Sequence, residues 1–349
     1  MKTKVLHLSL SHGGGIISAL ETYIINSPLS DHYLVAANDD SCQINISNPK
    51  NLVNTYIINL NFKGILSLYE IYKQIKPTHI HLHSSIAGVV GRLIFPFFKN
   101  VIYTPHCYAF ERTDISKIKR CFFYFAERLL ALKPTTVAGC SPREVTLGNE
   151  LAFKVFKKKI SNIFLTNYSS ITHKWQNPNN SIKRVIMIGR ICPQKDANFF
   201  IQTFKQLQLL DSSIKFYWIG NGADNDINKL LLNGITCSGW LSREELVDEV
   251  LNSDLYFHCA AWEGNPMSVL EVSRMEMPIV GRKIPSLESI GLKQLSTTPE
   301  GCAQLIYKHF NNKDSLANSE FVKVNELCSE KNQMEALKVI YSIKDNELH

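Results

Sequence analysis

The sequence predicts an α/β protein with two Rossmann-like domains that face each other across a cleft. Short apolar runs alternate with longer helical patterns along the whole chain. This alternation is typical of parallel sheets built from β–α–β units. The chain has 349 residues, more than one compact core usually holds. A polar, turn-rich stretch, TNYSSITHKWQNPNNSIK, divides the alternation into two sets. We therefore expect two parallel sheets rather than one.

The predicted strands follow in chain order. The first set is KVLHLSL, HYLVAA, HIHLHSS, VIYTPH and TTVAGCS, and the second is RVIMIGR, KFYWIGNG, ITCSGW, LYFHCA and PIVG. A final helical pattern places Met334, Leu337, Ile340 and Ile343 at helical spacing. We predict an N-terminal domain over 1–167, a linker over 168–181, a C-terminal domain over 182–325, and a helical segment over 326–349 that packs back on the N-terminal domain.

Composition and charge narrow the classes of function. Hydrophobic residues make up 45% and charged residues 20% of the chain, as in ordinary globular proteins. No apolar run of 18 residues occurs, so we expect no membrane span. The nine cysteines include no close pair, which favours scattered thiols in the reducing cytoplasm.

Residues 1–167 contain 19 of the 38 basic but 10 of the 31 acidic residues. This basic half favours an anionic partner or the inner face of the plasma membrane. No nucleic-acid-binding motif accompanies it, so we expect no nucleic-acid partner.

Candidate site residues follow the predicted strands. Ligands of parallel α/β sheets gather beyond the carboxyl ends of the strands. This rule selects Gly13 and Gly14 after the first strand, His83 and His106 after later ones, and, in the second half, Arg190, Gly220 to Gly222 and Glu263.

The stretch EGNPMSVLE holds Glu263 and Glu271 eight positions apart. Asn265 is a good N-cap and Pro266 suits a first helical turn. The start of such a helix directs N–H groups and positive dipole toward phosphate or sugar oxygens. Glu263 could accept a hydrogen bond from a sugar hydroxyl, and Glu271 could bind the two hydroxyls of a ribose. A capped surface helix with two solvated acids remains the alternative.

The stretch IGRICPQKD places Arg190 at a strand end and Lys195 just before a helix. Two cations at this position suit a leaving diphosphate, on which negative charge develops during the reaction. Ordinary surface cations are the alternative.

Together these motifs resemble a known family. IGRICPQKD, YWIGNG and CSGWLSREELVDEVLNSDLYFHCAAWEGNPMSVLE occur in the order typical of family 4 retaining nucleotide-sugar glycosyltransferases, which have the two-Rossmann-domain GT-B fold. HGGG followed by Glu21, HLHS, YTPH and VAGCS resemble the N-terminal half of that family more loosely. Three residues depart from the pattern of that family: Cys107 replaces the usual Asp, Asp196 the usual Gly after the lysine, and Met277 the usual Gly before Pro278. The replacements at Asp196 and Met277 leave the local backbone geometry open.

The resemblance implies a role for each matching residue. Arg190 and Lys195 would hold the donor diphosphate, Glu271 the ribose, and Glu263 a hydroxyl of the transferred sugar. His106 would lie beside the donor sugar and acceptor. The backbone after Glu263 would touch sugar and phosphate, and two glycines of the N-terminal domain would approach the diphosphate; these residues are Gly264, Asn265, Pro266, Met267 and Ser268, with Gly13 and Gly14.

The predicted function is retaining transfer of a sugar from a nucleoside diphosphate to an acceptor hydroxyl. By family analogy, the acceptor attacks from the face that the diphosphate leaves, and a leaving phosphate oxygen takes the proton. The composition is rich in Asn, Ile and Lys and resembles that of enzymes of bacterial capsule or O-antigen synthesis. We therefore expect a glycan or lipid-diphosphate-linked saccharide as acceptor. A 2-epimerase of the same fold and a non-catalytic nucleotide-sugar-binding protein remain alternatives. HGGGIISALE lacks the G-x-G-x-x-G spacing, which disfavours a dehydrogenase.

Three further patterns have simpler interpretations. Asp224 and Asp226 form a D-x-D that could hold a divalent metal, but we expect a plain loop and a metal-independent enzyme without a cofactor. The histidines of HIHLHSS share one face of a strand, and a strand is expected in preference to a zinc site. For residues 117–133, we expect the apolar face to pack on its own sheet; the alternative is contact with a membrane surface, favoured by the neighbouring lysines of FKVFKKKI. That face comprises Ile118, Phe122, Phe125, Leu129 and Leu132.

Overall fold

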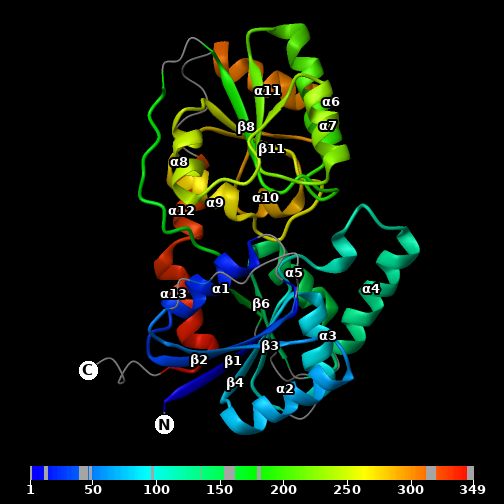
Figure 1. Ribbon diagram of the computed structural model, residues 1–349, viewed down its shortest axis with the longest axis vertical. Coiled ribbons are helices and arrows are strands. Elements are labelled where there is room, and N and C mark those ends of the chain that lie inside the picture. The colour runs from blue at the N-terminus through cyan, green and yellow to red at the C-terminus, as the bar shows by residue number, and fades with distance from the viewer. Residues whose placement is uncertain are drawn as a thin grey trace. The chain divides into compact units, whose positions relative to one another are not determined.

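The chain divides into two compact units, each built around one parallel sheet (Figure 1). The computed structural model describes residues 2–11, 15–38, 46, 49–95, 98–133, 135–152, 162–178, 182–311 and 320–343. Unit 1 comprises Met1–Glu111, Ile115–Tyr168 and Ser329–His349, and unit 2 comprises Arg112–Asp114 and Ser169–Cys328.

Unit 1 has a seven-stranded sheet in the order β3-β2-β1-β4-β5-β6-β7. Its strands are β1 Thr3–Ser9, β2 Ser30–Ala37, β3 Leu52–Ile58, β4 His79–His83, β5 Val101–Thr104, β6 Thr135–Gly139 and β7 Ile163–Phe164. Its helices are α1 Ile16–Ile25, α2 Phe62–Ile75, α3 Ser84–Ile94, the short η1 Ala109–Glu111, α4 Lys117–Leu130, α5 Pro142–Leu151 and α13 Glu330–Ile340. Every recorded strand pair is parallel.

Side-chain alternation along the strands of unit 1 separates two cores. Leu6 and Leu8 of β1 join Ile80 and Leu82 of β4 in a core shared with α2, α3 and α5. Residues on the opposite face of β1 pack against α1 and α13. Because strand residues alternate between faces, the odd-numbered histidines of β1 and β4 belong to the face covered by α1 and α13.

Unit 2 has a six-stranded parallel sheet in the order β10-β9-β8-β11-β12-β13. Its strands are β8 Arg184–Ile188, β9 Lys215–Ile219, β10 Thr236–Cys237, β11 Leu255–His258, β12 Ile279–Arg282 and β13 Leu295–Ser296. Its helices are α6 Ala197–Leu210, α7 Asp224–Leu232, α8 Arg243–Leu251, α9 Met267–Arg274, α10 Pro285–Ser289, α11 Pro299–Asn311 and α12 Glu320–Leu327.

Both sheets reverse their strand order once. In unit 1 the chain runs outward from β1 to β3 and then returns to β4 on the other side of β1. In unit 2 the corresponding reversal lies between β8 and β11. Loops diverge at such a switch point, so it is the usual ligand site of an open parallel sheet.

The C-terminal helix returns to unit 1, as the sequence predicts. Leu337, Ile340 and Tyr341 are buried against residues of β1, α1 and β6. Gln333 accepts a hydrogen bond from Asn26 at 2.7 Å and donates to the Thr166 carbonyl at 2.9 Å. These contacts make α13 part of the first sheet's covering layer.

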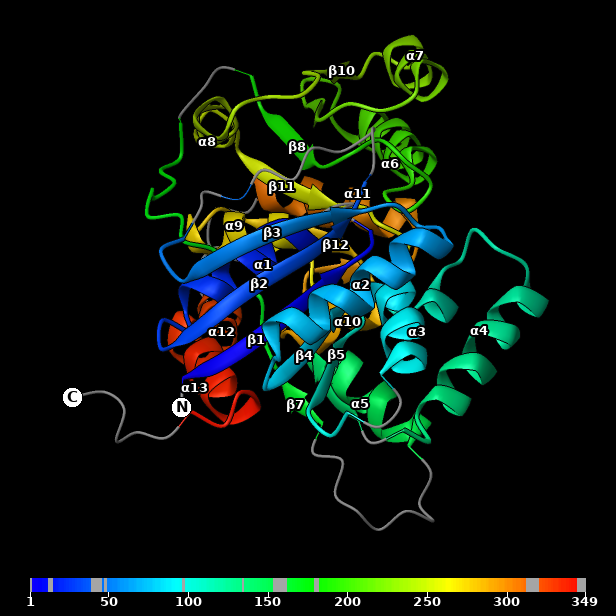
Figure 2. The same cartoon turned by 60° about the horizontal axis from the view of Figure 1, so that its bottom comes forward.

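Three local expectations were wrong. Pro266, not Asn265, occupies the N-cap position of α9. Asp224 and Asp226 lie in the first turn of α7 rather than in a loop, where negative charge complements the helix dipole. The apolar stripe of α4 does not pack on the sheet: its five side chains are between 47% and 83% exposed, and α4 lies on the outer side of unit 1 (Figure 2).

Asp196, where the resembling family usually has glycine, has a backbone conformation that suits glycine. Asp196 has a φ of 53°, in the left-handed region that glycine adopts most readily. Its side chain accepts a hydrogen bond from the Phe199 N–H at 3.1 Å, as the N-cap of α6, and pairs with Arg282 at 2.7 Å. Capping and charge pairing offset the backbone strain.

Candidate functional site

The loops after β8 and β11 meet at the switch point of unit 2. The Ala261 N–H donates to the Gln194 carbonyl at 2.8 Å, and the Gln194 amide donates to the Trp262 carbonyl at 3.1 Å. These bonds tie the IGRICPQKD segment to the start of the EGNPMSVLE segment. Two motifs that are about 70 residues apart in the sequence therefore form one edge of the sheet.

Lys195 and Glu263 form an ion pair at this edge. Lys195 Nζ lies 2.5 Å from Glu263 Oε1, and the Gln194 amide donates to Oε2 at 3.1 Å. The Lys195 and Glu263 side chains are only 15% and 9% exposed, respectively. Each oxygen of this buried carboxylate is thus engaged by a donor, as a buried charge requires. The sequence indicated both charged residues but gave no sign of their mutual contact, or of Gln194.

A buried hydrogen-bonded series lies beside Glu263 on the strand side, without a hydrogen bond to its carboxylate. The Tyr256 hydroxyl lies 2.8 Å from His258 Nδ1 and 2.9 Å from the Ser268 hydroxyl. His258 Nε2 lies 3.7 Å from Glu263 Oε1. Burial, followed by the charge of Lys195, lowers the pKa of His258 well below its usual value, so the ring is neutral near pH 7. Tyr256 and His258 were not predicted as site residues, because in the sequence they look like ordinary residues of a buried strand.

Arg190 lies in the same loop as Lys195, after β8. The residue is exposed, and no ion pair of its guanidinium is recorded within the described part of the chain. The preceding Gly189 has a φ of 138°, and a Cβ on the neighbouring Gly220 would lie 2.2 Å from the Gly189 carbonyl oxygen. The loops after β8 and β9 therefore approach more closely than residues with side chains allow.

The start of α9 and Glu271 complete the group in unit 2. Gly264, Asn265, Pro266 and Ser268 are buried and Met267 is partly buried, at the helix end where backbone N–H groups lack helical partners. Burial raises the pKa of Glu271 to about 7, against a smaller lowering by Arg243. No hydrogen bond to the Glu271 carboxylate is recorded among the described residues. This carboxylate is desolvated and available to hydroxyl donors.

A cavity of about 340 Å³ opens beside the same loops. Its walls include Cys192, Asp196, Trp262 and Arg282. The Arg190, Glu263 and Glu271 side chains do not contribute to these walls. We therefore centre the candidate site on the charged residues rather than on the cavity.

His106 belongs to unit 1, where it lies in a strained turn after β5. His106 and Cys107 have φ values of 51° and 94°, and Ser84 after β4 has a φ of 75°. Such values are uncommon for residues other than glycine and gather at functional sites. Gly13 and Gly14, predicted to contact the diphosphate, lie outside the described residues.

A buried carboxylate holds this turn. Glu144 accepts hydrogen bonds from the Cys107 N–H at 2.5 Å and from the Cys140 N–H at 2.9 Å. Burial raises the pKa of Glu144 to about 7, and the two backbone N–H groups oppose that rise. Glu144 was missed because the segment Ser141–Glu144 matches a common helix-start pattern, S-x-x-E.

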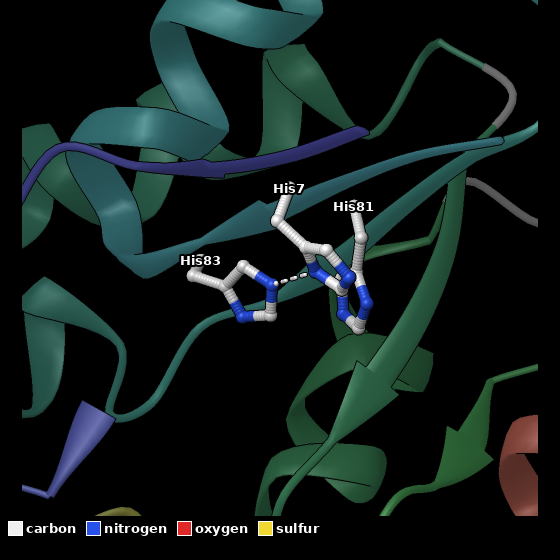
Figure 3. Close-up of side chains that lie close together, drawn as sticks. All are labelled: His7, His81 and His83. Atoms are coloured by element: carbon white, nitrogen blue, oxygen red, sulfur yellow. Dashed lines mark hydrogen bonds between the residues drawn. The ribbon is translucent and has the colours of Figure 1, made fainter. Parts of the chain in front are cut away.

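Histidines from several strands gather at the switch point of unit 1 (Figure 3). His7 Nδ1 lies 3.0 Å from His83 Nε2, and His83 Nδ1 lies 3.2 Å from His106 Nε2. His81 bonds instead to the Tyr341 hydroxyl and to Thr104, each at 2.8 Å. His7, His81 and His83 could together offer nitrogens to a metal ion, within 4.8 Å of one another. The sequence had grouped His81 and His83 with His79, not with His7 from another strand.

Comparisons with known proteins agree with this arrangement. Residues 170–291 match the family described as glycosyl transferases group 1. An uncharacterized 41.2 kDa protein in the cps region of Klebsiella pneumoniae is 23% identical over 309 residues, 82% of each chain. The UDP-Gal:alpha-D-GlcNAc-diphosphoundecaprenol alpha-1,3-galactosyltransferase of Escherichia coli is 26% identical over 249 residues, 63% of this chain and 61% of that protein.

The fold is shared with a solved structure. HepE of Anabaena, in complex with UDP-glucose, superposes with a TM-score of 0.79 at 13% identity, over 97% of this chain and 100% of that one.

Proposed function

We propose that the chain is a group 1 glycosyltransferase with the GT-B fold. In this proposal it transfers a hexose from a uridine diphosphate sugar to a lipid-diphosphate-linked saccharide, with retention of the anomeric configuration. The donor class is supported by the E. coli relative, named for UDP-Gal, and by HepE, solved with UDP-glucose. The acceptor class is supported by the diphosphoundecaprenol-linked substrate in the name of that relative. The Klebsiella relative from a cps region supports a role in bacterial surface polysaccharide synthesis.

The observation that carries this proposal is the charged group at the switch point of unit 2. Arg190 is available there, and Lys195 is paired with Glu263 at 2.5 Å. When a sugar diphosphate binds, Lys195 gains a second anionic partner and Glu263 accepts a hydroxyl of the sugar. The ion pair thereby links the two halves of the donor.

The reaction needs no carboxylate nucleophile. The bond between the anomeric carbon and the diphosphate oxygen breaks while a bond forms to the acceptor oxygen on the same face. The acceptor proton passes to an oxygen of the leaving diphosphate. Arg190 and Lys195 stabilise the charge that develops on this group, Glu271 binds the ribose hydroxyls, and His106 orients the reacting hydroxyl groups.

We further propose that the transfer is independent of metal ions. In this proposal the cationic side chains of Arg190 and Lys195 supply the positive charge that a divalent metal would otherwise supply. Asp224 and Asp226 lie in the first turn of α7, where their charges complement the helix dipole. This gives the D-x-D pattern a structural role.

A membrane surface is the proposed location of the acceptor. The stripe of α4 exposes Phe122 and Phe125 to 68% and 61%, and the exposed Lys117 and Lys119 lie at the start of the same helix. No helix within the described part of the chain is long and apolar enough to cross a bilayer. An exposed apolar stripe with exposed lysines at its start suits the interface of a membrane with anionic lipids. A lipid-linked acceptor would be met there, at the cytoplasmic face. The lysines of FKVFKKKI, expected to assist, lie outside the described residues.

The transfer is tested with UDP-hexoses and undecaprenyl-diphosphate-linked GlcNAc. We expect a product one hexose heavier, whose anomeric proton coupling in NMR matches that of the donor. An inverted anomeric centre would overturn the retaining mechanism. Epimerised UDP-sugar formed without acceptor would favour the epimerase, and donor binding without turnover would favour a binding protein.

The membrane contact is tested by flotation with vesicles. We expect binding to vesicles that contain phosphatidylglycerol, and at least a tenfold loss for the double variant Phe122→Ser/Phe125→Ser. Leu232→Ser is the matched control, since Leu232 is 87% exposed on α7 of unit 2. Equal binding of the wild type and the double variant would exclude α4 as the contact.

A further inference from the structure

A buried series of hydrogen bonds runs through unit 1 from Ser27 to His106. His32 Nε2 lies 2.9 Å from the Ser27 hydroxyl, and His32 Nδ1 lies 2.8 Å from His7 Nε2. The series continues from His7 Nδ1 to His83 at 3.0 Å and from His83 Nδ1 to His106 Nε2 at 3.2 Å. Figure 3 shows its central link, the bond between His7 and His83. Three strands and the loop after β5 contribute these four rings.

One end of the series fixes the direction of donation. The single proton of the Ser27 hydroxyl is directed to the Tyr23 carbonyl at 2.5 Å, so this oxygen can only accept from His32. His32 Nε2 also faces the Ser27 carbonyl at 3.3 Å, and a carbonyl is always an acceptor. His32 Nε2 must therefore carry a proton.

All four rings are neutral near pH 7. Burial lowers the pKa of His7 and His83 well below the usual 6.5, with the neighbouring histidines adding to the effect. Burial likewise lowers the pKa of His32 to about 4 and that of His106 to about 3. A neutral imidazole has one N–H and one bare nitrogen. A ring that donates at one nitrogen must accept at the other.

This rule carries the direction from His32 to His106. His32 Nδ1 is bare and accepts from His7 Nε2, so His7 Nδ1 is bare and accepts from His83 Nε2. His83 Nδ1 then accepts from His106 Nε2. His81 does not interrupt the series, since its two nitrogens bond to Tyr341 and Thr104.

We propose that Ser27, His32, His7 and His83 are positioning residues that fix the tautomer of His106, which donates from Nε2 to His83 and presents a bare Nδ1 as an acceptor at the end of β5. The strained turn held by Glu144 fixes the backbone of His106, and the series fixes its proton. The acceptor role of Nδ1 toward a substrate hydroxyl rests on the proposed function. The tautomer itself does not.

The tautomer is measured by NMR of the full chain with ¹⁵N-labelled histidine. His106→Gln identifies the His106 signals by their loss. We expect a pyrrole-type shift for Nε2 and a pyridine-type shift for Nδ1 at pH 7. The reverse pattern, or a doubly protonated ring, would overturn the proposal whether or not the protein transfers hexose.

Two substitutions at His83 separate direction from packing. In His83→Asn, the amide oxygen takes approximately the position of Nδ1 and still accepts from His106, so the tautomer should persist. His83→Phe fills the space without an acceptor, and the two tautomers of His106 should then mix. Both variants are compared at temperatures below their unfolding transitions. An unchanged tautomer in His83→Phe would show that the series does not set it.

A metal ion on His7, His81 and His83 is the competing interpretation. It would require bare nitrogens directed at the ion and would break the bond between His7 and His83. Metal analysis and zinc titration of the same labelled protein distinguish the two. One equivalent of tightly bound zinc that shifts the His7 and His83 signals would overturn the proposal, whereas unchanged signals support it.

Discussion

Glu271→Gln should have opposite effects on stability and on donor binding. Burial raises the pKa of this carboxyl from 4.5 to about 7. One unit of pKa corresponds to about 1.4 kcal/mol, so ionised Glu271 destabilises the folded chain by up to about 3 kcal/mol. The folded protein binds a proton that the unfolded chain releases above pH 4.5. This penalty therefore grows as pH rises from 4.5 to 7 and is complete at pH 8. Glutamine has nearly the same shape and no charge, so the variant should be more stable than the wild type at pH 8 and nearly equal to it at pH 4.5.

Donor binding should respond in the other direction. A hydrogen bond to a charged acceptor contributes about 1.5–3 kcal/mol, or roughly 10- to 150-fold in Kd. Glu271→Gln should weaken UDP-hexose binding at pH 8 toward this range. In the wild type, affinity should fall as pH drops through 7, because the carboxyl gains a proton. The variant should lack this component of the pH dependence.

Both effects can be measured on the same preparations. Urea unfolding between pH 4.5 and 8 gives the stability difference, and calorimetric titration with UDP-hexose gives Kd. Glu70→Gln is the control, since its side chain is 70% exposed on α2 of unit 1, and we expect little change in either quantity. If Glu271→Gln bound donor normally, the ribose assignment would fail. If it were no more stable at pH 8, the desolvated charge on which the argument rests would be absent.

Three further predictions concern the same reaction. Arg190→Ala and Lys195→Ala should each lower kcat by roughly 100- to 1000-fold, more than they weaken donor binding. The decrease in kcat of the double variant should be smaller than the product of the two single decreases. Near-normal steady-state turnover of either single variant would remove that residue from the site. Excess EDTA should leave hexose transfer unchanged, and a complete loss restored by magnesium would return a metal role to the acidic pair of α7. Glu144→Gln should lower kcat by up to about 100-fold with an unchanged Kd for UDP-hexose, because the amide has one acceptor oxygen for the two N–H groups of Cys107 and Cys140 and the link that fixes the turn at His106 is broken. An unchanged kcat would show that the turn keeps its shape without the carboxylate.

The fold and some residues of the charged site can be predicted from the sequence, because both depend on local patterns. Strand–helix alternation predicts parallel sheets, and strand ends predict where charged residues gather, as Arg190, Lys195 and Glu263 illustrate. Residues that act through distant partners give no such signal. Gln194 looks like any loop residue until its amide is seen on Glu263. His258 looks like a core residue until its ring is seen 3.7 Å from the same carboxylate.

The stripe of α4 shows a different limit. Its spacing correctly predicts an amphipathic helix, which begins at Lys117 and ends at Leu130. Periodicity alone cannot say whether the apolar face of a helix packs on a sheet or is exposed to solvent. A helix that packs on a sheet and a helix with an exposed apolar face have the same sequence pattern. Here the opposite side of the helix makes the fold contact: Glu127 is buried, pairs with Arg92 at 2.7 Å and accepts from the Tyr103 hydroxyl at 2.8 Å. Phe123 and Tyr124 of α4 also pack against the core of unit 1. This buried side holds α4 and leaves its apolar stripe exposed.

Stability and chemistry oppose each other at the edges of both sheets. Glu144 and Glu271 each have a pKa of about 7, raised by burial, so near neutral pH each destabilises the fold as it ionises. Replacing a buried acid by a neutral residue of similar shape is an available way to gain stability. Perturbed acids of this kind gather at functional sites. The two serve different tasks. One oxygen of Glu144 accepts from the Cys107 N–H in the turn at His106, and the other accepts from the Cys140 N–H after β6. No donor to the Glu271 carboxylate is recorded among the described residues, so its oxygens can accept from a ligand. Substitution of Glu144 should therefore change the rate of transfer, and substitution of Glu271 the affinity for the donor.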